Sequence, residues 1–392
     1  MKSDLLVIGG GAAGLFAAWT ASQQGKTVSV LERNKRFGLK ILISGGGRCN
    51  FTNLKVKKSN FHSQHPNFPR FALENFSSAQ FVELIQGTHI PFHEKKLGQL
   101  FCDRSSKDIL NMLLDGCRRT GVYLVSDVDV QKIQKDDSQN FTVQTSRGSF
   151  GASKVLIATG GLSFPKLGVS DFGYKVARQF GHKVTSREPA LVPLVLDSNI
   201  MSDLKQLAGV SCPVIVKIKK QVFEDDLLFT HWGLSGPAIL KASLYWQAGE
   251  PLRINLLPNV SLQEAFQNPG LRSLKISKYL DQFLPHRLVQ VWLDFEKIDS
   301  QLKIQEIPKK SLNKLANQIN QWTPTPIETE GFKKAEVTRG GVSLDEISPR
   351  TLESKLVPGL YFAGEVLDVT GWLGGYNFQW AWSSGYTVGS SC

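Results

Sequence analysis

The first thirty residues alternate between short apolar runs and a glycine-rich turn. Residues 4–8 are almost entirely apolar, which is typical of a strand buried in a parallel sheet. After three consecutive glycines, residues 12–24 have the Ala, Leu, Phe and Trp content of a buried helix. Gly25 ends this helix, and the valine-rich segment 27–31 predicts a second strand. The N-terminal segment is therefore expected to form a βαβ unit.

The pattern of the remaining chain changes twice. Residues 191–257 contain alternating apolar and polar runs, which indicate antiparallel strands, and residues 261–321 are helical with prolines as interruptions. The chain then returns to a strand at 360–363 and a helix that begins near Gly375. Before the first change, helical patterns cover 71–86, 105–119 and 171–180, and strand patterns cover 122–134, 140–145 and 149–158.

The turn after the first strand carries the strongest chemical signal. Residues 9–14, Gly-Gly-Gly-Ala-Ala-Gly, fit the pattern G-x-G-x-x-G between a predicted strand and a predicted helix. Gly9 permits the tight turn, Gly11 lets a pyrophosphate approach the backbone, and Gly14 allows close packing of helix and sheet. Glu32, at the end of the second strand, can accept hydrogen bonds from the ribose hydroxyls of an adenosine. Together these features predict a dinucleotide site.

Two further strands also end in glycine. They are residues 155–161, Val-Leu-Ile-Ala-Thr-Gly-Gly, and residues 359–365, Gly-Leu-Tyr-Phe-Ala-Gly-Glu. Ligands of Rossmann-type sheets lie across the carboxyl ends of the strands, so three such ends predict one extended cofactor. Glu365 would lie beside the ribitol and phosphates of a flavin, which favours FAD over NAD. No second G-x-G-x-x-G follows residue 40, so NAD(P)H is left open as a reductant without a Rossmann module of its own.

Several longer segments carry a family resemblance. They include Lys-x-x-x-Ser-Gly-Gly-Gly-Arg-Cys-Asn at 40–50, Leu-Phe-Thr-His at 228–231, the segment 335–342, and the C-terminal segment 364–382. With these segments the whole chain resembles a bacterial FAD-dependent flavoprotein family within the two-dinucleotide-binding-domain flavoproteins. The family is described as aminoacetone oxidase-like or as similar to BaiN of bile-acid metabolism. The resemblance implies FAD contacts at Gly9, Gly11, Ala13, Gly14, Glu32, Arg33, Lys40, Gly46, Gly47, Asn50, Val128, Gly160, Glu365, Asn377 and Phe378.

Some of these residues have competing interpretations. Arg33 can contact a phosphate or can be one solvated charge among several basic neighbours. Val128 is expected in a strand whose main chain pairs with the adenine edge. The final helix, opened by Gly374 and Gly375, would stabilise the negative charge of a reduced flavin with its positive end. The tryptophans of the C-terminal segment suit core packing better than flavin stacking.

The resemblance and the pattern together predict an α/β fold. We expect a Rossmann-like FAD-binding domain, split in sequence into residues 1–190 and 335–392. A β-rich inserted domain would comprise residues 191–258 and 322–334, and a helical subdomain residues 259–321. The two inserted parts are expected to form a cap over a substrate site.

Composition and charge limit the environment and partners. With 41% hydrophobic and 20% charged residues, most of the chain is folded. The net charge of +12, from 46 Lys and Arg against 34 Asp and Glu, is dispersed and favours anionic ligands. Nucleic acid is thus a candidate partner, although no known nucleic-acid module accompanies the charge. Five cysteines without a CxxC pair, no signal segment and no membrane span predict a cytoplasmic protein. The histidine spacing predicts no metal site.

These features predict an FAD-dependent oxidoreductase that transfers hydride between a small organic substrate and flavin N5. The sequence does not decide whether the enzyme is an oxidase or a reductase. It also leaves the oligomeric state open. His231 is the first candidate for a catalytic residue, with a structural histidine as the alternative. Cys49 has no cysteine partner at CxxxxC spacing, because residue 44 is Ser. Two other functions stay open: an RNA-associated flavoprotein similar to tRNA-modifying enzymes, and a non-catalytic flavin redox sensor.

Overall fold

A computed structural model describes residues 2–392 of the chain. The chain forms two compact units. The larger unit comprises Met1–Pro189 and Val337–Cys392, and the inserted unit comprises Ala190–Glu336. Among the described residues, no helix is both long and apolar enough to cross a membrane.

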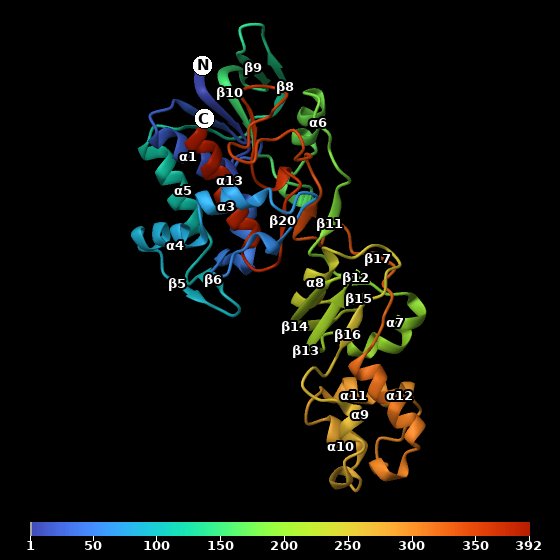
Figure 1. Cartoon of the computed structure of the whole chain (residues 1–392). Helices are drawn as coiled ribbons and strands as arrows, with labels where there is room; N and C mark the ends of the chain where they lie inside the picture. The colour runs from blue at the N-terminus through green and yellow to red at the C-terminus, as the bar shows by residue number, and fades with distance from the viewer. Residues whose placement is uncertain (1) are drawn as a thin grey trace. The chain divides into compact units, whose positions relative to one another are not determined.

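The larger unit is built on a seven-stranded sheet (Figure 1). Its strands are β1 (Lys2–Ile8), β2 (Val28–Leu31), β7 (Tyr123–Val125), β8 (Val130–Lys135), β9 (Phe141–Thr145), β10 (Gly148–Ile157) and β19 (Leu360–Phe362). The path runs β7-β2-β1-β10-β9-β8, and β19 pairs with β10. Strands β7, β2, β1, β10 and β19 are parallel, so their carboxyl ends meet at one edge. The predicted βαβ unit and α/β class are confirmed.

The larger unit also contains several helices. They are α1 (Ala12–Gln23), α2 (Leu39–Ile43), α3 (Pro69–Asn75), α4 (Ser78–Gly87), α5 (Lys107–Arg119), α6 (Phe172–Gln179) and α13 (Tyr376–Ser391). Helix α1 is buried almost all round because β1, α5 and α13 pack against it (Figure 1). The contact with α13 depends on glycine: a Cβ on Gly385 would lie 2.5 Å from the Ala13 carbonyl oxygen, and one on Gly389 2.6 Å from that of Ala17. The first and last helices therefore approach at backbone distance.

Three small sheets complete the larger unit and its junction. They are β3 (Asn50–Asn53), β6 (Gln99–Cys102) and β5 (Phe92–Glu94); β20 (Thr370–Gly371) and β4 (Phe61–His62); and β11 (Glu188–Ala190) and β18 (Val337–Arg339). The first of them is antiparallel in the order β3-β6-β5. The short strand β20, which shortly precedes α13, thus pairs with β4 from the first quarter of the chain.

Two predicted elements are each divided in the structure. The helical pattern at 71–86 forms α3 and α4, because Ser77 caps the second helix: its side chain accepts from the Gln80 N–H, and Gln80 accepts from the Ser77 N–H at 2.8 Å. The strand pattern at 122–134 forms β7 and β8. Asp127 separates them with a left-handed φ of 59°, which no extended strand adopts.

The inserted unit has its own six-stranded sheet in the order β16-β13-β14-β15-β12-β17. The strands are β12 (Leu194–Val195), β13 (Ser211–Ile218), β14 (Gln221–Phe229), β15 (Gly233–Ser235), β16 (Arg253–Asn255) and β17 (Glu328–Thr329). Its helices are α7 (Ser198–Leu204), α8 (Pro237–Ser243), α9 (Leu262–Ala265), α10 (Ile276–Leu280), α11 (His286–Phe295) and α12 (Lys309–Asn320). Strands β13, β14 and β16 are antiparallel, as the alternating pattern predicts.

Candidate cofactor site

The glycine-rich turn lies between β1 and α1 at the carboxyl edge of the large sheet. A Cβ on Gly9, which has a φ of 109°, would lie 2.4 Å from the Ala158 carbonyl oxygen, and one on Gly14 would lie 2.0 Å from that of Gly9. These two glycines are therefore required by packing. A Cβ on Gly11 would meet nothing within 4 Å, and no side chain caps the N-terminus of α1. The open space at Gly11 and the free N–H groups behind it suit a pyrophosphate.

Glu32 follows β2 at the same edge and is held rigidly. Its Oε2 accepts from the Gly10 N–H at 2.8 Å, and its Oε1 accepts from the main-chain and side-chain nitrogens of Asn34 at 2.8 and 2.9 Å. The residue as a whole is 9% exposed. Each carboxylate oxygen has more than one lone pair, so ribose hydroxyls can add to these bonds.

Two neighbouring candidates are placed differently from Glu32. Arg33 forms an ion pair with Asp129 at 3.4 Å, and both side chains are more than half exposed. Val128 lies in the loop beyond β7, not in a strand, and its N–H donates to the Glu32 carbonyl oxygen at 3.0 Å. The expectation of a strand at Val128 is therefore wrong. The predicted contact of its main chain with the adenine edge stays a prediction, and because the N–H is already bonded, it favours the carbonyl oxygen.

Further glycines shape an open surface beside the turn. Gly46 and Gly47 have left-handed φ values of 66° and 84° in the turn that precedes β3, and Gly160 has 73° beyond β10. A Cβ at any of these three positions would meet no atom within 4 Å. With Gly11 they make up a set of positions where the backbone is not covered by side chains, which we call the glycine cradle. Uncovered backbone beside a dinucleotide turn suits an extended dinucleotide.

A polar cluster closes the cradle at the end of β19. Lys40 Nζ lies 2.7 Å from Glu365 Oε2 and donates to Ser163 Oγ at 2.7 Å. The Thr338 N–H donates to Glu365 Oε1 at 2.8 Å. The structure thus brings Lys40 and Glu365 together. It adds Ser163, which sequence reasoning missed although it lies two residues beyond Gly161 at the end of the 155–161 segment.

The N-terminus of α13 follows two left-handed glycines, Gly374 and Gly375, and has no side-chain cap. The Asn377 side chain braces the preceding loop: its Oδ1 accepts from the Gly371 N–H at 2.8 Å, and its Nδ2 donates to the Gly371 carbonyl oxygen at 2.9 Å. Phe378 stacks on Trp382 with ring centroids 5.6 Å apart. The side chain of Asn377 is thus largely engaged within the protein, which favours its main-chain N–H for a contact with a flavin.

Asn50 lies beside this helix start. A Cβ on Gly375 would lie 2.9 Å from its Oδ1, and its amide is within hydrogen-bond distance of Gln99. Ala13 is buried in the first turn of α1, against Gly364 and Gly385. The packing of both residues is compatible with the predicted contact with FAD. Asn50 also links β3 to the start of α13.

Two of the three tryptophans of the C-terminal segment, and the cysteine near the site, are buried in the core. Trp380 Nε1 donates to the Gly364 carbonyl oxygen at 3.0 Å, and Trp382 Nε1 donates to that of Phe51 at 2.8 Å. Both rings are buried, as expected for core packing. Cys49 is a buried free thiol whose pKa is raised by burial, so it stays protonated.

Asp368 is a second acid near the site that sequence reasoning did not single out. It is 5% exposed, and burial raises its pKa from 3.8 to about 6, against the opposing effects of His65 and Arg339. Arg339 itself forms an ion pair with Glu188. Asp368 lies three residues beyond Glu365. Because its raised pKa is close to neutral pH, uptake of a proton by Asp368 removes one negative charge near Glu365.

His231 belongs to the inserted unit, whereas all the residues above belong to the larger unit. It lies in the turn between β14 and β15 with an exposed side chain. Its catalytic role stays a prediction. Within residues 2–392, no three His, Cys, Asp or Glu side chains are arranged to hold a metal ion.

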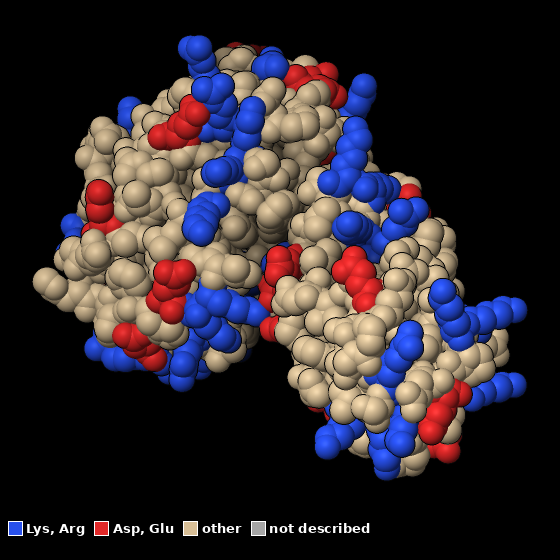
Figure 2. Space-filling view, turned by 60° about the horizontal axis from the view of Figure 1, so that its bottom comes forward, with Lys and Arg blue, Asp and Glu red and all other residues tan. Residues whose placement is uncertain are grey.

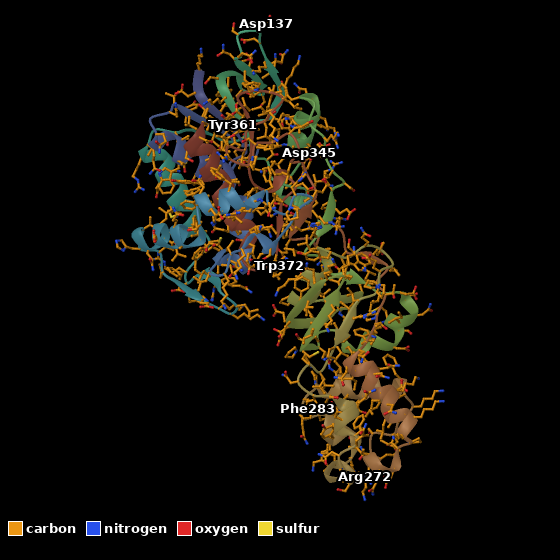
Figure 3. The ribbon with its side chains drawn as sticks, in the orientation of Figure 1. Asp137, Arg272, Phe283, Asp345, Tyr361 and Trp372 are labelled. Carbon is orange, nitrogen blue, oxygen red and sulfur yellow. The ribbon has the colours of Figure 1, made fainter. Side chains whose placement is uncertain are left out.

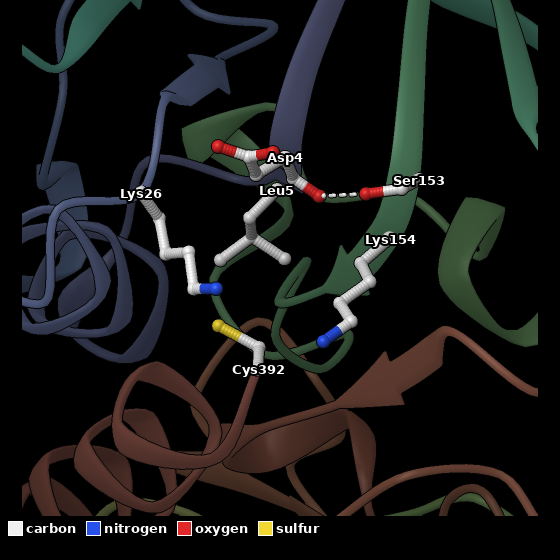
Figure 4. Close-up of a pocket in the computed structure, with 6 residues that line it drawn as sticks. All are labelled: Asp4, Leu5, Lys26, Ser153, Lys154 and Cys392. Atoms are coloured by element: carbon white, nitrogen blue, oxygen red, sulfur yellow. Dashed lines mark hydrogen bonds between the residues drawn. The ribbon is translucent and has the colours of Figure 1, made fainter.

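A small pocket elsewhere in the larger unit is unrelated to this edge (Figure 4). It is lined by Asp4, Leu5, Lys26, Ser153, Lys154 and Cys392. Residues 4–5 lie in the first half of β1, and residues 153–154 lie three or four residues before the end of β10, so the pocket is away from the carboxyl ends of these strands, where the glycine turn lies. It takes no part in the cofactor site.

A dinucleotide turn on a parallel sheet, an acid after β2 and an uncapped helix facing a glycine cradle define a Rossmann-type flavoprotein. The chain belongs to the family described as HI0933-like protein Rossmann domain, whose model matches residues 3–391. It is 45% identical to a ribosomal RNA dihydrouridine synthase of Escherichia coli, over 98% of this chain and 96% of that protein. It is 31% identical to a 3-dehydro-bile acid delta(4,6)-reductase of Clostridium scindens, over 98% and 97%.

Solved structures support the fold class. A 3-ketosteroid-delta4-(5alpha)-dehydrogenase of Rhodococcus jostii matches with a TM-score of 0.50 and 16% identity, over 99% of this chain and 97% of that one. The predicted α/β fold with its Rossmann-like domain is confirmed. The chain is an FAD-dependent oxidoreductase, and FAD is its cofactor. The contacts of FAD with Gly11, Gly46, Gly47 and Gly160 stay predictions, which the open space at these four positions favours.

Proposed function

We propose that this protein reduces the C5=C6 bond of a uridine in ribosomal RNA. The observation that carries the proposal is the 45% identity, over nearly the full length of both chains, with a protein named ribosomal RNA dihydrouridine synthase. The net charge of +12 supports a polyanionic substrate. Hydride would then pass from the reduced flavin to the substrate, which is the reductase direction.

The reaction balances as a two-electron reduction. The uridine π bond between C5 and C6 is lost and two C–H bonds form, one from a hydride and one from a proton. FAD, when bound, supplies the hydride and is recharged by a two-electron donor such as NADPH or NADH. The residues of this chain bind and orient the cofactor, and the proton comes from water or from an acidic group.

Particular residues suit each part of the cofactor. The Gly11 turn and the N-terminus of α1 would hold the pyrophosphate, and Glu32 the adenosine ribose. The linked pair of Lys40 and Glu365 would bind the ribitol and phosphate portion. The free N–H groups of α13 would stabilise negative charge on the flavin ring.

The proposal is tested with purified protein loaded with FAD. The protein is incubated anaerobically with NADPH or NADH and with unmodified transcripts of the small-subunit and the large-subunit ribosomal RNA. Nucleosides are then analysed by mass spectrometry, and a uridine that gains two hydrogens is the expected product. Protein stripped of FAD is the control. Bleaching of the flavin by the reductant without any dihydrouridine in either RNA would contradict the proposal.

A second candidate function has its own support. The relative named 3-dehydro-bile acid delta(4,6)-reductase is 31% identical over 98% of this chain, which favours reduction of a C=C bond in a small molecule. The same anaerobic assay with a 3-keto-4,6-diene steroid in place of RNA separates the two. Turnover of the steroid without turnover of RNA would establish this second function. His231→Ala, assayed on whichever substrate reacts, tests the catalytic role predicted for that histidine.

A further inference from the structure

The positive charge is concentrated in one of the two units. The larger unit has 29 Lys and Arg against 19 Asp and Glu, a net of +10, whereas the inserted unit has 17 against 15, a net of +2. Figure 2 shows many basic side chains over the visible face of the larger unit, with acidic ones fewer. One FAD, with about two negative charges on its pyrophosphate, does not account for this surplus.

Four lysines of the larger unit form what we call the basic rim: Lys55, Lys57, Lys58 and Lys95, all exposed. Three of them follow β3, and Lys95 lies at the turn between β5 and β6. The two segments are joined by their main chains, because the Leu54 N–H donates to the Gly98 carbonyl oxygen at 2.8 Å. Lysines from two stretches of sequence therefore lie at the same end of the β3-β6-β5 sheet, where β3 and β5 end and β6 begins.

The lysines of the basic rim differ from other basic residues of this unit in their partners. Among the ion pairs described for residues 2–392, none joins a carboxylate to these four lysines. Lys58 instead donates to the neutral amide of Asn67, and Lys95 lies over the Phe101 ring at 5.5 Å. By contrast, Arg70, Arg104 and Arg118 on nearby helices and loops each have an acidic partner three or four residues away.

The basic rim is attached to the start of α13. Asn53 Nδ2, at the end of β3, donates to the Gly374 carbonyl oxygen at 3.0 Å. At the other end of the lysine segment, the Asn60 carbonyl oxygen accepts from the Trp372 N–H at 2.9 Å. Figure 3 shows Trp372 at the edge of the larger unit. Since residues 372–375 lead into the helix start that lines the cradle, the lysines border the cofactor site.

We propose that the basic rim binds the phosphate backbone of folded RNA and so holds a uridine beside the cofactor site. The identity of the ligand as RNA rests on the proposed function. The chemistry favours a polyanion over a protein or a membrane, because four unneutralised ammonium groups are accompanied by only two exposed apolar side chains, Leu54 and Leu97. Lysine contacts to phosphate give binding that depends steeply on salt.

The test compares two triple variants of the FAD-loaded protein. One is Lys55→Gln, Lys57→Gln and Lys95→Gln. The matched control is Lys2→Gln, Lys132→Gln and Lys175→Gln, three exposed lysines of the same unit on β1, β8 and α6. Binding to unmodified ribosomal RNA transcripts is measured by gel shift from about 0.05 to 0.2 M salt, with flavin absorbance and melting temperature recorded for each.

A plot of log K against log salt has a negative slope, and loss of three phosphate contacts should reduce the steepness of that slope by about 2 to 3. Binding at 0.1 M salt should weaken at least about tenfold. The rim variant should show this loss, while the control keeps a wild-type slope and both retain FAD. Equal slopes for rim variant and wild type would overturn the inference, as would absence of RNA binding by the wild type. Binding lost by both triple variants alike would overturn it too, because charge alone would then explain it.

The two proposals fail separately. If the wild type forms no dihydrouridine but binds RNA with a slope that only the rim variant loses, the surface stands and the reaction does not. If dihydrouridine forms equally well with the rim variant at every salt concentration, the reaction stands and the surface does not. A vesicle of anionic phospholipid serves as the alternative polyanion. Rim-dependent binding to the vesicle and not to RNA would replace RNA as the occupant.

Discussion

Lys40 Nζ lies 2.7 Å from Glu365 Oε2 and joins two segments that are 325 residues apart in sequence. Lys40 lies in α2, beside the glycine-rich turn of residues 44–47, and Glu365 follows β19. The pair therefore connects the two parts of the split larger unit at the carboxyl edge of its sheet. Because Glu365 is mostly buried, removing its cation changes the site more than a surface ion pair would.

Lys40→Met should weaken FAD binding by about tenfold or more, since a charge-assisted hydrogen bond is worth about 1.5 to 3 kcal/mol. FAD affinity is measured by fluorescence titration of the stripped protein. Glu365→Gln and the double variant complete a double-mutant cycle. Because the two side chains contact each other, the double variant should lose less affinity than the sum of the single losses. Additive losses would show that the two residues act independently on FAD.

Gly11→Ala and Gly14→Ala should have opposite consequences. A methyl group at Gly11 meets no protein atom, so the unfolding free energy should change by less than about 1 kcal/mol, while FAD affinity falls because the pyrophosphate loses its approach. At Gly14 the methyl carbon would lie 2.0 Å from the Gly9 carbonyl oxygen, so the fold itself should lose several kcal/mol. Urea unfolding without FAD, beside FAD titration, checks both. Unaltered FAD affinity in Gly11→Ala would refute the predicted role of Gly11.

Glu32→Gln should weaken both FAD binding and the fold. The carboxylate accepts three N–H groups, from Gly10 and twice from Asn34, and a glutamine would present an NH₂ group to one of these donors. We expect a loss of about 1.5 to 3 kcal/mol in unfolding free energy without FAD. Glu74→Gln, which removes an exposed carboxylate paired with Arg70, is the control and should be nearly neutral. A variant as stable as wild type would show that these bonds do not support the turn.

Asp368→Asn should stabilise the protein at high pH. Burial raises the pKa of Asp368 from 3.8 to about 6, so the folded state favours the protonated form. Its contribution to stability is complete below pH 4 and is lost as the pH rises through 6. The free energy of unfolding of the variant should therefore exceed that of wild type by near zero at pH 4 and by about 3 kcal/mol at pH 8, as measured by urea unfolding.

Asp345→Asn provides the opposite trend to Asp368→Asn. Hydrogen bonds from His65 and Ser343 lower the pKa of Asp345, so its contribution to stability is present above the ordinary pKa of 3.8 and is lost in acid. This variant should lose stability relative to wild type above pH 4. The same pH trend for both variants would contradict the assignment of burial as the cause at Asp368.

The sequence predicts the parts of the cofactor site that depend on local chemistry. The turn at 9–14 and the strand ends at 155–161 and 359–365 are recognisable because glycine is needed where backbone approaches backbone or ligand, and the spacing of strand, turn and helix is local. Parallel pairing then places these ends at one edge, as the registers of β1, β2, β10 and β19 show. The α/β class follows from the same local pattern.

The tertiary structure decided how each side chain is used. Ser163 joins Lys40 and Glu365, the Val128 N–H bonds the Glu32 carbonyl oxygen, and the Asn377 side chain braces Gly371. Hydrogen bonds of this kind join residues whose separation in sequence carries no period, so no pattern announces them. The burial of Asp368 is likewise set by packing from several segments. The sequence alone determined the glycine turn at 9–14 and the succession of strand, turn and helix around it, because these follow from local backbone geometry, whereas the order of the strands in the sheet came from the tertiary structure. Charge neighbourhoods such as the basic rim arise only when distant strands pair.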